Sequence, residues 1–283
     1  MKIIRVFPRR TKATPVDGMA FVGEPPLSEF RPPADEVHVS VTFTWDLKGA
    51  EELARSWGRF YQKVRVGGPA LGDAGGEFVP GLYLRPGYTI TSRGCPNVCP
   101  FCLVPQRETR CEIDPVPVGH IVQDNNLLAC SDEHIERVLA MLSAQRKGAV
   151  FAGGLQADLF TTERAQQIYS DAPVSELWFA YDAESAWGRT EDALRRAIYW
   201  FGNGWNMPQE KVRCYVLAGF DGDTPEAAAA RCEQVLRVGA IPFIMPWQPP
   251  DRYIRYQGDW KPVIYTWSRV PAMKAIARKL RFT

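Results

Sequence analysis

The chain has 283 residues, 46% of them hydrophobic, and a formal net charge of +2. Such a chain can bury one large domain, or one domain with a small appendage. No apolar stretch approaches the roughly 20 residues needed to cross a bilayer, so we expect a soluble protein with no membrane partner. The seven cysteines are an odd number and no signal peptide opens the chain. We therefore expect reduced thiols and a cytoplasmic location rather than a disulfide framework.

Residues 1–82 have the pattern of a small α/β module. A Pro-rich passage follows its first strand, and the pair Gly67 and Gly68 indicates a turn at the end of its last strand. The periodicity predicts three strands and one helix, at Ile3–Phe7, Val37–Thr44 and Val64–Val66 for the strands and Leu47–Trp57 for the helix.

From residue 88 onward, short apolar runs alternate with amphipathic stretches, which is typical of βα units around a parallel sheet. Six strands are predicted, at Tyr88–Ser92, His120–Leu128, Ala149–Gly153, Glu176–Tyr181, Val212–Gly219 and Ile241–Pro246. Four helices are predicted between them, each after a Ser or Thr that can cap its first turn: Asp132–Gln145 after Ser131, Glu163–Tyr169 after Thr161 or Thr162, Glu191–Phe201 after Thr190, and Glu226–Val238 after Thr224. Glycines stand where helices are expected to stop, at Gly148, Gly202 and Gly239.

The most specific motif is a group of three cysteines, Cys95, Cys99 and Cys102, with the spacing C-x3-C-x2-C. Three thiolates within one loop can hold three irons of a [4Fe–4S] cube and leave its fourth iron open for a ligand. The alternative is a zinc site completed by Cys111, since C-x2-C pairs are common zinc ligands. A compact triplet that follows an apolar run, at 82–90, favours the iron–sulfur interpretation.

This motif, with Phe101 directly before its last cysteine, resembles the signature of the radical S-adenosylmethionine (SAM) superfamily. The resemblance implies that Cys95, Cys99 and Cys102 are the metal ligands and catalytic centre, and that SAM binds the open iron. An electron from a flavodoxin- or ferredoxin-type donor would then cleave SAM to methionine and a 5′-deoxyadenosyl radical, which abstracts hydrogen from substrate. It also implies a partial (β/α)6 barrel of the TIM type over residues 83–250. Its active site would lie at the carboxyl ends of the strands.

The resemblance extends to positions that would bind SAM. Where many members have Gly-Gly-Glu after the second strand, this chain has Asp-Asn-Asn, which is more similar to an Asp-Asp-Asn variant, so Asp124 and Asn125 are the expected contacts of the SAM amino group. The other expected cofactor-binding residues are Phe101, Gly153, Gly154, Gln156, Asp182 and Gly219. Each has an ordinary structural alternative: packing for the aromatic ring, turn chemistry for the Asp-Asn pair and the glycines, and a capping or solvent-facing role for Asp182.

The small module at 1–82 is similar to a truncated cobalamin-binding domain of the kind that precedes some radical SAM barrels. The cobalt-ligand signature Asp-x-His-x-x-Gly is absent, because His38 lacks both its Asp and its Gly. We therefore interpret His38 as a strand residue and do not expect cobalamin to bind.

The C-terminal extension, residues 251–283, is basic. It holds eight Lys or Arg and two Asp, a net charge of +6, which leaves the first 250 residues at −4. Aromatic residues are interleaved with these cations, a mixture that suits phosphates and stacked bases. The alternative is a solvated helix over 271–281 that turns its cations to water and packs Met273, Ile276 and Leu280 inward; the cations in question are Lys274, Arg278, Lys279 and Arg281.

Together these features predict a radical SAM enzyme that acts on a phosphate-bearing substrate. The basic extension suggests nucleic acid, and the fold-level analogy is to bacteriophage enzymes that rearrange or modify an amino-acid-decorated nucleobase such as thymidine in DNA. Two alternatives stay open. One is a cobalamin-dependent methyltransferase or small-metabolite tailoring enzyme, and the other is a non-catalytic nucleic-acid-binding protein with a structural zinc site.

Overall fold

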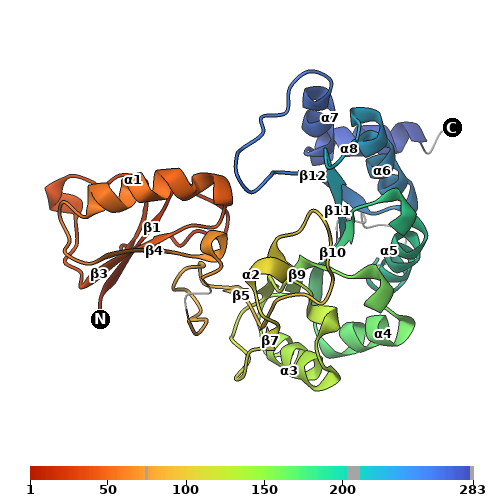
Figure 1. Cartoon of the computed structure of the whole chain (residues 1–283). Coiled ribbons are helices and arrows are strands. Elements are labelled where there is room, and N and C mark those ends of the chain that lie inside the picture. Colours follow the sequence, from red (N-terminus) through yellow and green to blue (C-terminus); the bar gives the residue numbers. More distant parts are fainter. Residues whose placement is uncertain (74–75, 203–210, 281–283) are drawn as a thin grey trace.

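The computed structural model describes residues 1–73, 76–202 and 211–280. The chain folds as an α/β protein with a four-stranded sheet, a six-stranded sheet and a two-stranded ribbon. Figure 1 shows the four-stranded sheet with its own helix at one side of a larger body built on the six-stranded sheet. The two sheets have separate hydrophobic clusters, one between residues 4 and 70 and one between residues 122 and 273.

The N-terminal sheet is fully parallel, in the order β2-β1-β3-β4. Its strands are β1 (Ile3–Phe7), β2 (Ala20–Val22), β3 (Glu36–Ser40) and β4 (Val64–Gly67), and its helix is α1 (Leu47–Trp57). Leu53 and Trp57 of the helix pack on Ile4, Val37 and Val39 of the strands, so one sheet face is apolar. The predicted strands and helix are confirmed, apart from residues 41–44. Strand β2 was not predicted, because three residues are too few to show a period.

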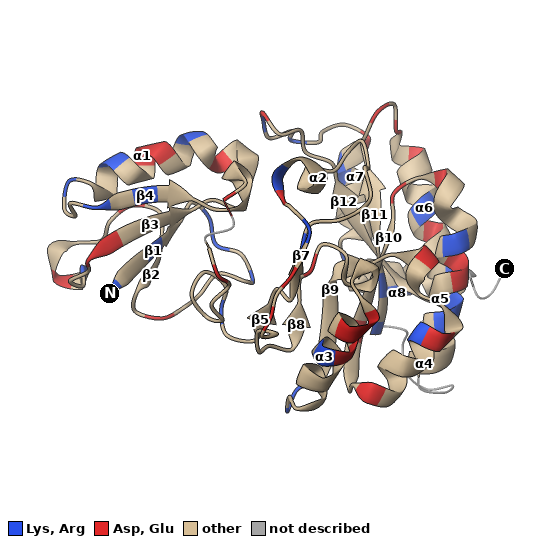
Figure 2. Cartoon of the chain, turned by 60° about the horizontal axis from the view of Figure 1, so that its bottom comes forward, with Lys and Arg blue, Asp and Glu red and all other residues tan. Residues whose placement is uncertain are grey.

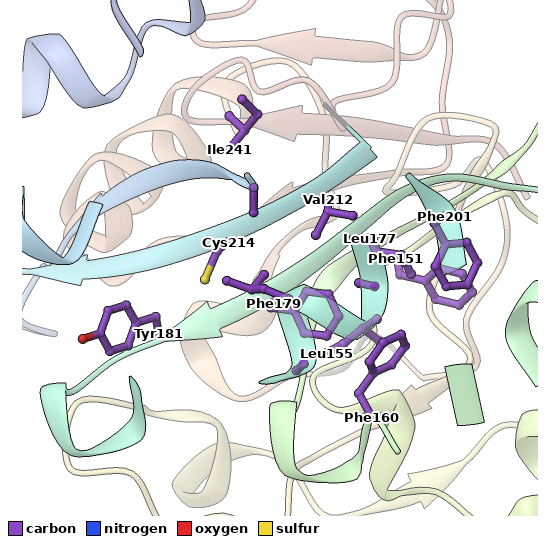
Figure 3. Packing of buried hydrophobic residues seen from close by; sticks show 14 of the residues in the cluster. Phe151, Leu155, Phe160, Leu177, Phe179, Tyr181, Phe201, Val212, Cys214 and Ile241 are labelled. Atoms are coloured by element: carbon purple, nitrogen blue, oxygen red, sulfur yellow. The ribbon is translucent and has the colours of Figure 1, made fainter. Parts of the chain in front are cut away.

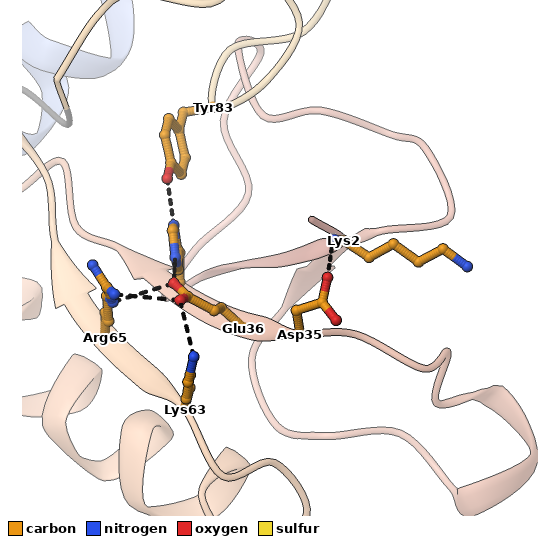
Figure 4. A network of polar contacts seen from close by, with 7 residues as sticks. Lys2, Asp35, Glu36, Lys63, Arg65 and Tyr83 are labelled. Atoms are coloured by element: carbon orange, nitrogen blue, oxygen red, sulfur yellow. Dashed lines mark hydrogen bonds and ion pairs between the residues drawn. The ribbon is translucent and has the colours of Figure 1, made fainter.

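The other face of this sheet is polar. Glu36 is 5% exposed, and its carboxylate pairs with His38 at 2.9 Å and with Arg65 at 3.2 Å. Figure 4 shows Arg65 and Lys63 pointing at this carboxylate, while the Tyr83 hydroxyl meets the imidazole from the loop after the module. His38 is therefore a strand residue with both ring nitrogens engaged.

The six-stranded sheet is also fully parallel, and its strands lie side by side in chain order. They are β5 (Tyr88–Thr89), β8 (Ile121–Val122), β9 (Ala149–Leu155), β10 (Val174–Tyr181), β11 (Val212–Ala218) and β12 (Ile241–Pro246). The prediction of six parallel strands is confirmed. Within the described part of the chain the edge strands β5 and β12 do not pair with each other, so the sheet is open, and its description as a barrel stays a prediction.

Four helices pack on this sheet: α3 (Asp132–Ser143), α4 (Thr162–Asp171), α5 (Trp187–Phe201) and α6 (Pro225–Val238). Alternate residues of β10, namely Leu177, Phe179 and Tyr181, are fully buried in the cluster that these helices complete (Figure 3). The residues between them, such as Trp178, are half-buried. One face of the sheet is thus sealed and the other is more accessible. Along the outer helices, acidic and basic residues are interspersed (Figure 2).

Three of the four predicted helix caps are confirmed. The side-chain oxygens of Ser131, Thr161 and Thr224 each accept a hydrogen bond from the backbone N–H three residues later, at 3.2 Å. The prediction for Thr190 was wrong: α5 begins at Trp187, and the Thr190 hydroxyl is buried and donates to the Ala186 carbonyl. A Thr or Ser that could cap a helix can also lie within the helix and donate its hydroxyl to the carbonyl four residues earlier. The sequence alone does not distinguish these two positions.

The first two strands of the large sheet are much shorter than predicted. The chain leaves β5 after Thr89 and forms β6 (Ser92–Arg93), which pairs antiparallel with β7 (Cys111–Glu112). It leaves β8 after Val122, and Leu127–Ala129 form a 3-10 turn. Only a single helical turn, α2 (Val104–Arg107), lies between β5 and β8. This part of the sheet therefore carries long loops at its carboxyl edge instead of a packed helix.

The C-terminal extension packs on the large body through α7 (Trp260–Trp267) and α8 (Val270–Leu280). Trp267 and Met273 are buried in the main cluster, whereas Lys274, Arg278 and Lys279 are exposed. The solvated-helix alternative thus describes α8 as far as it is seen; Arg281 lies outside the described residues. Across the described ranges, no helix is both long enough and apolar enough to span a membrane.

Candidate functional site

The cysteine loop leaves the large sheet at its carboxyl edge. It begins at β6, where Gly94 has φ +73° and a Cβ there would lie 2.8 Å from the Arg110 backbone nitrogen. Only glycine fits this close crossing of the two ribbon strands. Within the loop, the Cys102 N–H donates to the Cys99 carbonyl at 3.0 Å, which folds the C-x2-C segment into a tight turn. The backbone therefore presents Cys95, Cys99 and Cys102 on one compact turn-rich segment.

Asp124 anchors the start of this loop. Its side chain is 2% exposed, and its carboxylate accepts hydrogen bonds from the Thr91 N–H at 2.6 Å, the Thr91 hydroxyl and the Ser92 hydroxyl at 2.8 Å. Burial raises the pKa of Asp124, and these hydrogen bonds oppose the rise. The carboxylate is occupied by the protein itself. The structure thus gives Asp124 an anchoring role in place of the expected contact with the SAM amino group.

The two glycines near the carboxyl end of β9 are required by the backbone. A Cβ on Gly153 would lie 1.9 Å from the Asp124 carbonyl oxygen, and Gly154 has φ +92°. The pairing of β9 with β10 also shifts register at this point. Gly153 and Gly154 therefore let β9 pass directly under the Asp124 backbone, which explains both glycines without a ligand.

A cluster of amide side chains surrounds Cys95. The Asn126 Nδ2 group lies 3.5 Å from the Cys95 sulfur and donates to Gln156 Oε1 at 2.7 Å. Gln156 Oε1 also accepts from Asn97 of the cysteine loop at 2.9 Å. Asn125 Oδ1 accepts from the Gly94 N–H at 3.1 Å. Asn125 and Gln156, both expected at the site, do meet the cysteine loop.

Asn126 has an unmet hydrogen-bonding need. It is 5% exposed, and its Oδ1 atom is buried with no hydrogen-bond partner among the described residues. A buried acceptor without a partner costs free energy, on the order of 1–3 kcal/mol. Such a cost beside Cys95 indicates a missing donor, and a cationic amino group would satisfy it.

Electrostatics connect two of the thiols, Cys99 and Cys102, with Asp182. Burial raises the pKa of Cys99, and the charge of Asp182 raises it further. The other two thiols of the loop act on Cys99 in the same direction, and Cys102 responds to burial and to Cys95 and Asp182 as well. Asp182, at the end of β10, has a pKa raised to about 6 by burial. Asp182 and Cys99, which are 83 positions apart in the sequence, are thus brought to one site.

Beside Asp182 lies a pocket of about 380 Å³ at the ends of β10 and β11 and the start of α6. Its wall includes the acidic residues Glu184, Asp221 and Asp223. Asp223 is already engaged, because it accepts from the Gly219 N–H at 2.8 Å and pairs with buried Arg231 at 2.6 Å. The pocket therefore offers acceptors to a neutral or cationic ligand that carries hydroxyl or amino groups.

The segment after β12 covers the cysteine loop. The Trp247 indole N–H donates to the Phe101 carbonyl at 3.4 Å, and Phe220 packs between the two rings, 5.2 Å from Trp247 and 5.7 Å from Phe101. The Tyr256 hydroxyl donates to the Trp247 carbonyl at 2.7 Å and stands where a Cβ on Gly219 would be. The expected ligand face of Gly219 is thus occupied by Tyr256.

The donor set of the cysteine loop fits an iron–sulfur cluster. No three His, Cys, Asp or Glu side chains of the described residues are already gathered as a metal-ligand group. Binding would therefore require the thiols to turn toward one another. Three soft thiolates, an N–H group aimed at one of them, and an orphaned acceptor beside it are the features that such a centre uses. Cys111 is exposed, and its backbone pairs with Arg93 in the ribbon formed by β6 and β7. This position does not favour Cys111 as a fourth metal ligand.

Sequence reasoning missed Asn97, Asn126, Trp247 and Tyr256. Asn126 belongs to the run Asp124-Asn125-Asn126, of which only the first two residues were predicted to bind SAM. Trp247 reaches the Phe101 carbonyl from 146 residues away, and Tyr256 meets Gly219 from another segment. No local pattern in the sequence indicates such contacts.

Comparison of the chain with protein-family models, with curated proteins and with solved structures finds no match in any of the three.

Gly153→Ala tests the close packing under the site. The new Cβ would meet the Asp124 backbone, which cannot move aside as a flexible side chain would, so we expect a loss of roughly 1–3 kcal/mol in unfolding free energy. The control is Gly188→Ala in α5, where nothing lies within 4 Å and helix propensity favours alanine by up to about 1 kcal/mol. Urea unfolding measures both. Equal stability of the two variants would contradict the packing described.

His134 makes the anchor sensitive to acid. It is fully buried in α3, its Nε2 lies 3.3 Å from the Thr91 hydroxyl, and burial lowers its pKa. The fold therefore holds it neutral, whereas the unfolded chain takes up a proton below about pH 6.5. Stability should fall as the pH drops through that value toward the lowered pKa of the folded state. We expect His134→Gln to lose less stability than the wild type between pH 7.5 and pH 5.5, as measured by urea midpoints. An unchanged pH slope would disprove it.

Proposed function

We propose that the chain is a radical SAM enzyme. Cys95, Cys99 and Cys102 would hold a [4Fe–4S] cluster, and SAM would occupy the remaining iron. The single observation that carries the proposal is the cysteine loop itself, which leaves the first of six consecutive parallel strands at the carboxyl edge, beside the buried Asn126 oxygen, which has no donor among the described residues. When bound, the cluster supplies one electron that cleaves SAM to methionine and the 5′-deoxyadenosyl radical.

The chain's own residues have defined tasks in this proposal. Asn126 would accept a hydrogen bond from the SAM amino group through its orphaned Oδ1, while its Nδ2 steadies the sulfur of Cys95. Gln156 holds Asn126 and Asn97 in place through one shared oxygen. In this proposal Asn126, held by Gln156, contacts the SAM amino group in place of Asp124. The Asp124 carboxylate already accepts hydrogen bonds from Thr91 and Ser92.

The acidic pocket beside the cysteine loop suits the nucleoside part of SAM. Asp182 lines it, and a carboxylate at this rim can accept hydrogen bonds from ribose hydroxyls. Phe220, which also lines the pocket, contacts both Phe101 and Trp247. This aromatic cover would exclude water from the radical, which is a main task of the protein when the cofactors supply the chemistry.

For the substrate we propose a nucleobase, in DNA or as a nucleotide, on the basis of the cationic and aromatic residues analysed below. The electron would come from a flavodoxin- or ferredoxin-type protein in the cytoplasm, because a thiolate-bound cluster with an open iron needs a reducing compartment. The cobalamin alternative is weakened, since His38 is bound to Glu36 and Tyr83 and has no free nitrogen. The zinc alternative is weakened by the exposed position of Cys111.

Cys99→Ala tests the assignment, with Cys111→Ala as the control. After anaerobic reconstitution, the wild type and the control should each bind about four iron and four sulfide per chain and release 5′-deoxyadenosine from SAM when reduced. Cys99→Ala should release none, because one of three ligands is missing, while its circular dichroism stays that of the wild type.

Two results would contradict the proposal. Full SAM cleavage by Cys99→Ala would show that this cysteine is not a cluster ligand. One zinc per chain, lost when Cys111 is replaced, would instead identify a structural zinc site.

A further inference from the structure

Three separate segments bring aromatic rings and an arginine together at the carboxyl edge of the N-terminal sheet. Phe43 and Trp45 follow β3 and are stacked, with ring centroids 4.8 Å apart and planes at 13°. Tyr253, from the loop after β12, lies 5.8 Å from Trp45. The Arg9 guanidinium, which follows β1, lies 5.6 Å from the Phe43 ring and 6.0 Å from the Trp45 ring. We call Phe43, Trp45 and Tyr253 the aromatic platform.

The platform is not an ordinary core cluster. Tyr253 is 59% exposed, and Phe43 and Trp45 are only half-buried. The Trp45 indole N–H is nevertheless buried, with no hydrogen-bond partner among the described residues. Rings that pack to fill a core are covered, and a buried indole usually finds an acceptor. Here the Tyr253 ring is exposed to a ligand, and the Trp45 indole N–H has no acceptor among the described residues.

The Arg9 guanidinium is held in one position beside the rings. Its Nε donates to Asp46 at 2.5 Å, and the carboxylate accepts a second hydrogen bond from the same guanidinium. A paired guanidinium that also lies against two aromatic rings is pre-organised for a planar ligand. Two of these three segments bring further exposed cations, Arg10, Lys12, Arg252 and Arg255. The acids next to the platform residues, Asp46 beside Trp45 and Asp251 near Tyr253, are each paired with an arginine.

A rigid loop joins the platform to the cysteine site. The Gln248 side chain closes the loop with two hydrogen bonds to the Ile254 backbone, at 2.6 and 3.1 Å. At its start, Trp247 is bonded to the Phe101 carbonyl, and Tyr256 fixes its far end. Figure 1 shows this segment running from β12 toward the N-terminal module. Tyr253 is therefore only six residues from the indole that covers the cysteine loop.

We infer that the aromatic platform stacks a nucleobase whose phosphate is neutralised by the surrounding arginines, and that it positions this nucleobase as the substrate of the cysteine site. Aromatic rings bind any base through its π face, and nearby cations follow its backbone. That the bound nucleobase is the substrate rests on the proposed function. That the platform binds a nucleobase does not depend on it. The source of the base, a single nucleotide or a strand, is left to the test.

Tyr253→Ala and Trp45→Ala test the platform, with Tyr265→Ala as the matched control. Tyr265 is 55% exposed and also carries an arginine, Arg269, over its ring, but it lies on α7. The reconstituted full chain is titrated against fluorescein-labelled dodecathymidylate, with thymidine 5′-monophosphate as competitor. We expect each platform variant to bind about 5- to 100-fold more weakly and the control to bind like the wild type. Arg9→Gln should lower the slope of log affinity against log salt by about 0.7.

Competition by the mononucleotide at similar concentration would identify a nucleotide as the ligand, and binding of the oligonucleotide alone would identify a strand. Both results support a nucleobase site. Wild-type binding by Tyr253→Ala, which removes an exposed ring and should fold normally, would overturn the inference. So would an equal loss in Tyr265→Ala, or no binding by the wild type.

The two proposals fail separately in this experiment, because 5′-deoxyadenosine release is measured on the same preparations. The Tyr265→Ala control should still cleave SAM without substrate. Loss of oligonucleotide binding in a chain that never cleaves SAM would reject the proposed function and keep the platform. Normal cleavage with unaltered binding in both platform variants would reject the platform and keep the proposed function.

Discussion

The buried carboxylate of Asp124 is the interaction on which the site depends. It lies just after β8 and receives three hydrogen bonds from Thr91 and Ser92, just after β5. The two shortest strands of the large sheet are thus joined by a side chain beyond the point where their ladder ends. The next residue, Asn125, holds Gly94, and Asn126 meets Cys95. Without the carboxylate, the pairing of β5 with β8 would rest on a ladder of two residue pairs.

This anchor explains why the neighbouring glycines and His134 are where they are. Gly153 allows β9 to pass under the Asp124 backbone, and His134 touches the same Thr91 hydroxyl from α3. The result is a rigid base beneath the loop that carries the three cysteines. Trp247 links the neighbouring parts, because Phe220 of the acidic pocket packs on its ring and the platform residue Tyr253 follows six residues later in the chain.

The fold was predictable from the sequence where the signal is local. Long strands such as β10 and β11 show a clear alternation, and Ser131, Thr161 and Thr224 stand directly before amphipathic runs. Prediction failed where a contact with a residue far away in the sequence determines where a strand ends. The apolar run after His120 looks like a strand, but Asp124 turns its carboxylate back to Thr91 and ends the ladder.

The site was predictable in part for the same reason. The cysteine spacing is a local pattern. Gln156 was found because it follows a predicted strand, and Asn125 because its run resembles the Asp-Asp-Asn variant. The orphaned oxygen of Asn126, the ring of Tyr256 over Gly219 and the meeting of Trp45 with Tyr253 depend on contacts between remote segments. No periodicity in the sequence reports such contacts.

The central claim is that the cysteine loop holds a cluster with one iron open to SAM. Electron paramagnetic resonance of the reconstituted, dithionite-reduced protein, recorded with and without SAM, tests it most directly. The account predicts the signal of a reduced [4Fe–4S] cluster and a change in its g values when SAM is added. A protein without an iron–sulfur signal, or a signal that SAM leaves unchanged, would contradict the account.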